Sequence, residues 1–132
     1  MKQKALITLL LIFATMTVNA NEVIAQKIKD VYKSEKLFTN TNMENMSMYG
    51  YSTDMEFKTA LEKLKNTLGA SWEQQKMDPA QKELIFKKSG QKFNGMEIFN
   101  KGEKMISITH LNMPMEGRKY LLQLSIITTA KK

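Results

Sequence analysis

The sequence predicts an α+β domain: two amphipathic helices packed on a C-terminal antiparallel β-meander, preceded by a cleaved signal peptide. Three observations predict it. Two segments in the first half carry apolar residues at helical spacing, the last third alternates apolar and polar residues between glycines, and residues 1–20 resemble an export signal. With 132 residues and no Cys, the chain has the length of one domain stabilised by packing rather than by disulfides.

Residues 1–20 have the three parts of a secretory signal. Lys2 and Lys4 form the charged start, residues 6–13 are apolar, and Val18-Asn19-Ala20 is an A-x-A-like cleavage site. A retained membrane anchor is the alternative, but the apolar run is shorter than the roughly 18 to 20 residues that span a bilayer. We therefore expect a mature domain over residues 21–132, periplasmic or secreted, with no stable membrane insertion after signal removal.

The first helix of the mature chain is expected from Glu22 to about Lys33. Its apolar residues recur at helical spacing: Ile24, Ile28, Val31 and Tyr32. Residues 38–48 are rich in Asn, Thr and Met without a clear period. They predict a loop, followed by a short strand over about residues 46–52.

The second helix is predicted over residues 54–68. Thr53 and Glu56 have the spacing of a capping box, and Gly69 follows as a C-terminal stop. One face of this segment is apolar: Phe57, Leu61, Leu64 and Leu68. Trp72 comes just after the helix, where a large indole is expected to pack as a lid on the core.

The sequence predicts a short further helix from Pro79 to Lys87, because Asp78 and Pro79 resemble an N-cap followed by a first helical position. The competing interpretation is a strand through residues 84–86. Periodicity alone does not separate the two for so short an apolar run.

Three antiparallel strands are predicted in the C-terminal third: residues 96–100, 104–111 and 119–128, with a turn over 114–117. In the middle strand Ile106, Ile108 and His110 share one face. Met105, Thr109 and Leu111 share the other, because side chains alternate along a strand. Whichever face the helices leave free is the candidate contact surface.

The residue inventory argues against catalysis. With no Cys and a single His, the chain has no thiol nucleophile, no Cys-based zinc site and no two-His motif, and its scattered glycines form no phosphate-binding loop. The net charge is +7, and it falls to +5 when residues 1–20 are removed with their two lysines. We predict a non-enzymatic binding module of the bacterial cell envelope without a cofactor, inhibitor-like or immunity-like in size. Its partner would be a protein or an anionic envelope component, and export argues against nucleic acid.

A periplasmic Cu(I)-binding carrier is the alternative function. His110, Met113 and Met115 repeat the spacing of Met43, Met46 and Met48, and thioether and imidazole groups suit soft Cu(I). The competing interpretation is that methionine fills gaps in the core and that His110 is a hydrogen-bonded core residue.

Overall fold

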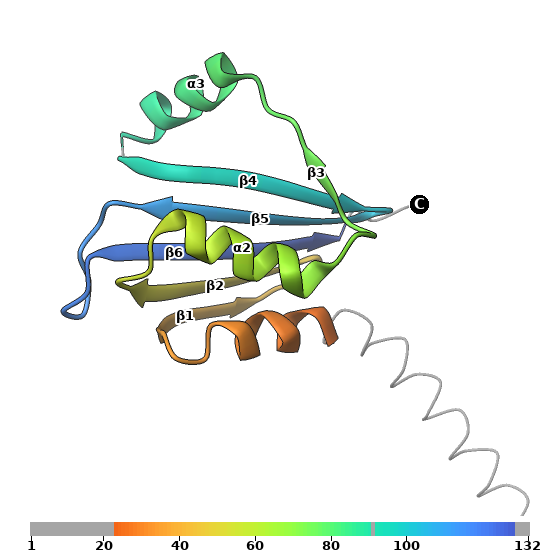
Figure 1. The fold of residues 1–132 in the computed structure, drawn as a ribbon, viewed down its shortest axis with the longest axis horizontal. Coiled ribbons are helices and arrows are strands. Elements are labelled where there is room, and N and C mark those ends of the chain that lie inside the picture. The colour runs from red at the N-terminus through yellow and green to blue at the C-terminus, as the bar shows by residue number, and fades with distance from the viewer. Residues whose placement is uncertain (1–22, 91, 129–132) are drawn as a thin grey trace, which may run out of the picture.

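The computed structural model describes residues 23–90 and 92–128 and has the predicted α+β class (Figure 1). Within these residues three helices accompany one six-stranded antiparallel sheet. In chain order the elements are a helix over residues 23–31, β1 (Lys36–Asn42), β2 (Met46–Thr53), α2 (Phe57–Leu68), β3 (Glu73–Gln75), α3 (Pro79–Ser89), β4 (Phe93–Lys101), β5 (Lys104–Leu111) and β6 (Tyr120–Thr128). The predicted signal peptide lies outside the described residues.

The strand order is β1-β2-β6-β5-β4-β3, with every neighbouring pair antiparallel. The predicted meander is present as β4-β5-β6. The N-terminal hairpin β1-β2 joins it through the long-range pairing of β2 with β6, and β3 adds a short strand beside β4. The sheet therefore has six strands, which is twice the number in the meander that the sequence predicts.

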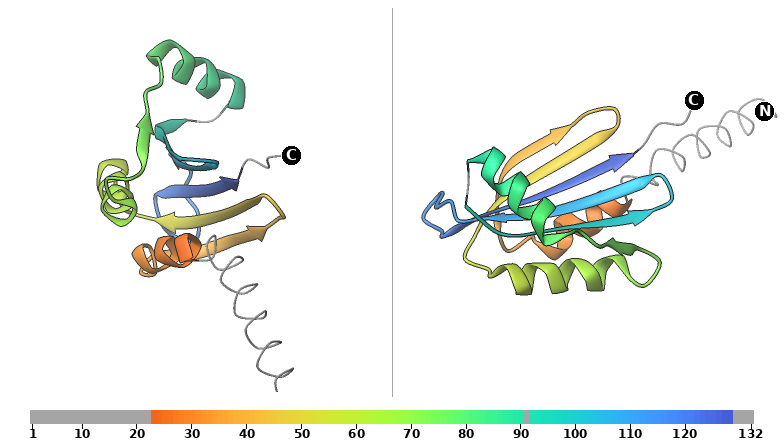
Figure 2. Two further views of the ribbon diagram at one scale, coloured as in Figure 1. Left: turned by 90° about the vertical axis from the view of Figure 1, so that its right-hand side faces the viewer. Right: turned by 90° about the horizontal axis from the view of Figure 1, so that it is seen from above.

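Helix 23–31 and α2 lie side by side on one face of the sheet (Figure 2). Their apolar sides meet the sheet in a single core, in which Ile28, Leu64 and Ile108 are fully buried. The hydroxyl of Tyr32 donates a hydrogen bond of 2.7 Å to the carbonyl of Ala60 and so joins the two helical segments. Burial of each large aliphatic side chain contributes about 1.5–3 kcal/mol, which makes this layer the main source of stability.

Strand β1 occupies residues 38–42 of the predicted loop over 38–48, and β2 begins at Met46, so the loop prediction was wrong for these residues. The strand is at the sheet edge and is almost wholly exposed, with the sequence KLFTNTN. Its Asn and Thr residues do not alternate with apolar residues, because neither side of this exposed edge strand packs against the core. Backbone pairing with β2 holds it in place, with an irregularity between Leu37 and Thr39. The expected strand over 46–52 is confirmed as β2.

The predicted capping box at the second helix is also wrong. Thr53 ends β2 instead of capping, α2 begins at Phe57, and its N-cap Glu56 makes no side-chain cap bond. The Thr53 hydroxyl instead accepts a hydrogen bond from the amide of Met55 and donates one to Glu35. At the other end Gly69 is the C-cap, with φ 78° and its amide bonded to the carbonyl of Lys65, as predicted.

Residues 84–86 are helical, so the alternative strand is wrong and α3 is a third helix. Asp78 caps it, accepting a bond from the amide of Ala80. None of its residues is buried. It projects from the β4 edge of the sheet, where Phe86 stacks on Phe93 with ring centroids 4.5 Å apart. The expectation of two helices packed on the sheet therefore holds for helix 23–31 and α2, whereas α3 packs on neither face.

Trp72 is 7% exposed and belongs to the core, as expected of a lid residue. None of the helices in the described part of the chain is both long and apolar enough to cross a membrane.

Candidate functional site

The helices pack on one face of the sheet and leave the other without a helical layer. The helices cover the face that carries Ile106, Ile108 and His110, all of which are fully buried. Met105 and Thr109 point to the opposite side, over which no described helix packs, and both are half-buried. The structure thus selects one of the two faces left open by the sequence as the candidate contact surface.

Strand register arranges this uncovered face into four cross-strand rows over β2, β6, β5 and β4. The rows are Met46-Ile127-Met105-Asn100, Met48-Ser125-Ser107-Ile98, Gly50-Gln123-Thr109-Met96 and Ser52-Leu121-Leu111-Phe93. We call these rows the uncovered face. Its last row is not open to solvent, because Ser52, Leu111 and Leu121 are buried. Beside them, the ring of Phe38 lies over Gly50, where an added Cβ would be 3.1 Å from its Cζ atom.

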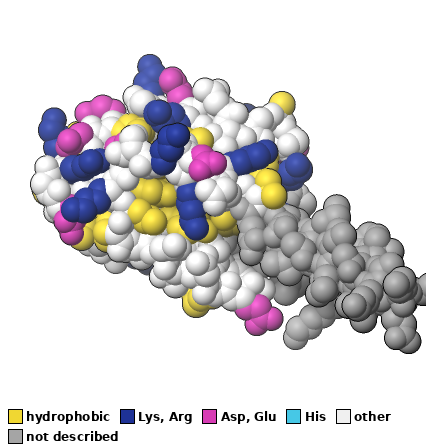
Figure 3. All heavy atoms as spheres, turned by 90° about the horizontal axis from the view of Figure 1, so that it is seen from below, with side chains coloured by type: hydrophobic (Ala, Val, Ile, Leu, Met, Phe, Trp, Pro, Cys, Tyr) yellow, Lys and Arg dark blue, Asp and Glu magenta, His cyan; other side chains and the backbone are white. Residues whose placement is uncertain are grey.

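No Lys, Arg, Asp, Glu or His belongs to the four rows. Their side chains are thioethers, aliphatic or aromatic groups, hydroxyls and amides. In Figure 3, the helix layer is toward the top and the uncovered face toward the bottom. This view looks onto the β1 edge, so the uncovered face is seen only from its side; most charged side chains lie in the upper part, and an acidic side chain projects at the lower margin. The four rows therefore lack the charged groups that ordinarily occupy a solvated surface. Charged residues stand at their ends, where Lys36 of β1 pairs with Ser52 and Glu73 of β3 pairs with Asn100.

Four methionines lie on this face, one or two on each of β2, β4 and β5. They are Met46, Met48, Met96 and Met105, and all four are half-buried. Methionine has three rotatable bonds and a polarisable sulfur, so it adapts its shape to a contacting surface. Of the methionines that the sequence left between metal binding and core filling, Met46 and Met48 are sheet-surface residues, whereas Met43, Met113 and Met115 lie in the connections between strands.

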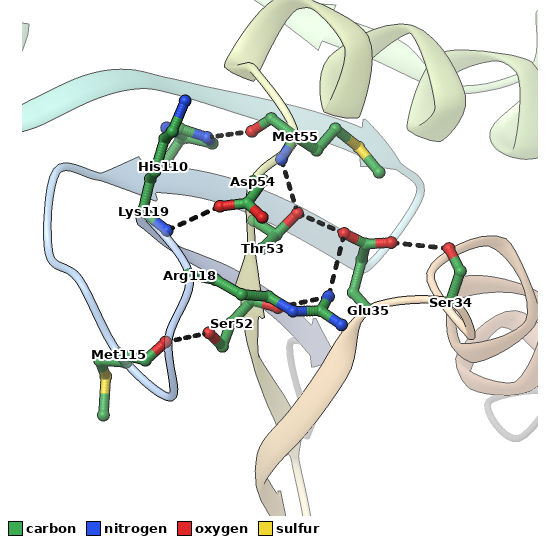
Figure 4. A network of polar contacts seen from close by, with 10 residues as sticks. All are labelled: Ser34, Glu35, Ser52, Thr53, Asp54, Met55, His110, Met115, Arg118 and Lys119. Atoms are coloured by element: carbon green, nitrogen blue, oxygen red, sulfur yellow. Dashed lines mark hydrogen bonds and ion pairs between the residues drawn. The ribbon is translucent and has the colours of Figure 1, made fainter.

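The loop between β5 and β6 closes one end of the uncovered face. Its tip is a two-residue hairpin in which Met115 and Arg118 exchange both backbone hydrogen bonds, at 3.0 and 2.9 Å. Glu116 and Gly117 both have positive φ, 54° and 79°, which is the geometry of a type I′ turn. The hydroxyl of Ser52, in the end row, donates to the carbonyl of Met115 (Figure 4).

A polar network anchors this loop to the start of β1. The guanidinium of Arg118 lies 3.6 Å from the carboxylate of Glu35, whose side chain is 11% exposed, and donates to the carbonyl of Ser52 (Figure 4). Asp54 accepts a bond from the amide of Lys119 at 3.0 Å. The carboxylate of Glu35 has both a cation and hydroxyl donors as partners, so its hydrogen-bonding capacity is used and the network holds the loop against the start of β1.

His110 is fully buried, and both of its ring nitrogens have hydrogen-bond partners. Nε2 lies 2.7 Å from the carbonyl of Met55 and therefore carries the proton, which leaves Nδ1 to accept from the amide of Asn94 at 2.9 Å. The ring also packs 4.5 Å from the ring of Tyr120, centroid to centroid. Burial lowers the pKa of His110, against the raising effects of the Met55 hydrogen bond and of Glu56.

The predicted copper ligands occupy different surroundings. His110 is inside the covered core, whereas Met113 and Met115 lie in the β5-β6 loop, and the Met115 side chain points away from the network (Figure 4). A metal at His110 would have to replace one of its two hydrogen bonds. Within the described residues no group of three or more His, Cys, Asp or Glu side chains is placed to hold a metal ion.

The sequence predicted that β5 contributes to this face, but it did not predict how far the face extends across the sheet. The pairing of β2 with β6 brings Met46 and Met48 onto the same surface as Met105. Nothing local in the sequence signals that pairing. Comparison with known proteins found no match: no family model, no curated protein and no solved structure resembles this chain.

Proposed function

We propose that this chain is an exported, non-enzymatic binding module that docks a protein partner through its uncovered face. The observation that carries the proposal is the absence of charge from the four described rows. A quarter of the whole chain consists of charged residues, yet none belongs to these rows. The cores of protein interfaces are similarly depleted of charge and enriched in methionine.

The chemistry of the face favours a protein over an anionic polymer. A polyanion would be held by Lys or Arg, and the rows contain neither. Ser107, Thr109 and Gln123 instead offer hydroxyl and amide groups between apolar neighbours such as Met48 and Ile98. This mixture suits a partner surface that is itself uncharged, partly apolar and able to form hydrogen bonds.

The size of the face is adequate for such a partner. Five strands of seven to nine residues form it, including β1 at its margin. With about 4.8 Å between strands and about 3.3 Å per residue, its three open rows measure roughly 24 by 20 Å, or about 480 Å². A standard interface buries about 800 Å² on each partner, so this face and its rim supply most of one.

A charge placed in the middle of the face tests the proposal. Ser107→Lys puts an ammonium group between Ser125 and Ile98, where a docked partner would have to desolvate it. We expect this to weaken partner binding at least tenfold, about 1.4 kcal/mol. Thr59→Lys, on the exposed side of α2, adds the same charge elsewhere and is the matched control.

The measurement begins with recovery of a partner by the unmodified protein from envelope extracts. Purified partner is then titrated against the unmodified chain and both variants, after thermal unfolding has shown that all three are folded. Loss of affinity in Ser107→Lys but not in Thr59→Lys supports the proposal. Equal affinity of all three proteins contradicts it, as does a self-association that Ser107→Lys abolishes, because the occupant would then be a second copy.

A further inference from the structure

A second surface feature lies at the opposite end of the sheet from the β5-β6 loop. It is a groove of about 660 Å³, within the range of about 300–1,000 Å³ typical of small-molecule sites. The start of helix 23–31, the segment after α2, the β4-β5 turn and the end of β6 line it. Its described lining residues are Val23, Ile24, Trp72, Lys101, Gly102, Glu103, Lys104 and Thr128.

The inner part of the groove is apolar. Trp72 and Ile24 lie against the core, and Val23 is 49% exposed although it is a large aliphatic residue. These side chains come from two segments far apart in the sequence. Together they form an apolar bed open to solvent on one side.

Two lysines stand together at the edge of this bed. Lys101 and Lys104 are register partners across the β4-β5 turn, so their side chains leave the sheet on the same face as neighbours. Like charges directly opposite each other in a β-ladder repel. Neither lysine forms an ion pair with a described residue, in contrast to Lys82, which pairs with Glu97 at 2.8 Å.

An anion between the two ammonium groups would remove their repulsion. Glu103, in the turn itself, is the acidic residue among the described lining residues, so this described lining carries more positive than negative charge. A lysine acts as a point charge that does not demand a planar two-pronged ligand. A carboxylate attached to an apolar chain matches both the lysine pair and the apolar bed.

We propose that this groove binds a free, single-chain anionic amphiphile of the fatty-acid type. The apolar chain lies on Val23, Ile24 and Trp72, and the carboxylate lies between Lys101 and Lys104. This site is separate from the uncovered face, and its ligand does not depend on the proposed protein partner.

The chain contains one Trp, and it lines the groove, so its fluorescence reports directly on occupancy. The protein is expressed with its own N-terminal segment and purified in the form that the cell retains. It is titrated with dodecanoate below its micellar concentration, with dodecanol as the neutral analogue, and with vesicles of anionic phospholipid. Fluorescence and calorimetry are recorded in each titration.

We expect saturable dodecanoate binding with a changed Trp72 emission, and binding of dodecanol that is weaker by about tenfold. Replacing both groove lysines, Lys101→Gln with Lys104→Gln, should weaken dodecanoate binding by a similar factor. The matched control, Lys87→Gln with Lys88→Gln on exposed α3, should leave it unchanged. Val23→Asp should abolish binding in a folded protein, because it places a carboxylate in the bed at an already exposed position.

Four results would overturn the proposal. They are no saturable signal with dodecanoate, equal affinity for dodecanol, equal losses in the two lysine double variants, and binding to vesicles without binding to the monomeric amphiphile. The last result would identify a membrane surface rather than a free amphiphile as the partner. Ser107→Lys should bind dodecanoate normally, which separates this test from that of the uncovered face.

Discussion

The ring of Phe57 lies against the backbone of Gly95, so that a Cβ at position 95 would be 2.1 Å from its Cε2 atom. Phe57 is the first residue of α2, and Gly95 is the register partner of His110 in the β4-β5 ladder. This contact therefore seats the start of the helix on the sheet. A glycine is needed at position 95 because of the close approach, not because of an unusual φ.

We expect Gly95→Ala to lower the free energy of unfolding by about 1–3 kcal/mol, the usual cost of overpacking. Chemical denaturation measures the loss. Gly50→Ala is the comparison, because the nearest atom to its new Cβ, at 3.1 Å, belongs to the partly exposed ring of Phe38. That ring can move outward, so the loss should be smaller, and equal losses would show that Phe57 is not held against Gly95.

Two neighbouring tyrosines should respond oppositely to loss of their hydroxyl groups. The Tyr51 hydroxyl is buried and has no hydrogen-bond partner among the described residues, and burial raises its pKa to about 12. The Tyr32 hydroxyl, also buried, donates to the carbonyl of Ala60. Urea titrations should show Tyr51→Phe to be neutral or up to about 1 kcal/mol more stable, and Tyr32→Phe about 1 kcal/mol less stable. A marked destabilisation by Tyr51→Phe would reveal a partner for its hydroxyl.

The protein should lose stability as the pH falls below about 6.5. Burial lowers the pKa of His110 in the folded state below its ordinary value, so the unfolded chain binds the proton more readily. The stability contributed by the neutral ring is complete above the unfolded pKa of about 6.5 and is lost as the pH falls toward the lower folded value. NMR titration of the imidazole in the folded protein gives that folded value directly. A folded pKa above 6.5 would mean that Glu56 and the Met55 carbonyl outweigh burial.

The helices and central strands could be predicted from the sequence because their burial is periodic. In β5, Ile106 and Ile108 alternate with polar residues, and in α2 the residues Leu64 and Leu68 repeat at one turn. Strand β3, with the sequence EQQ, is fully exposed and so carries no such pattern. The preference of Thr for N-cap positions gave a wrong prediction at Thr53, because its hydroxyl bonds to Glu35 rather than to the start of α2.

The candidate surfaces depend on long-range relationships that no local pattern contains. The uncovered face forms because β2 pairs with β6 and because helix 23–31 and α2 pack on the same side of the sheet. The groove needs Trp72 to lie near the β4-β5 turn, and its lysine pair depends on the register that sets Lys101 opposite Lys104. The sequence showed these lysines only as members of a general basic excess.

Export remains a prediction from residues 1–20, and the N-terminus of the protein recovered from cells tests it. Intact-mass analysis should give a chain that begins at Asn21, because cleavage after an A-x-A-like site removes the charged start and the apolar run. Ala20→Lys, which spoils the cleavage site, should retain the full-length mass. A full-length unmodified protein in the cytosol would contradict export.

Photocrosslinking in the cells that make the protein tests docking through the uncovered face most directly. A photoreactive amino acid replaces Ser107 in the middle of the uncovered face or, as the control, Thr59 on the exposed side of α2. We expect a discrete adduct with one partner protein from position 107 and none from position 59. Adducts of equal yield from both positions, or from position 59 alone, would contradict docking through the uncovered face.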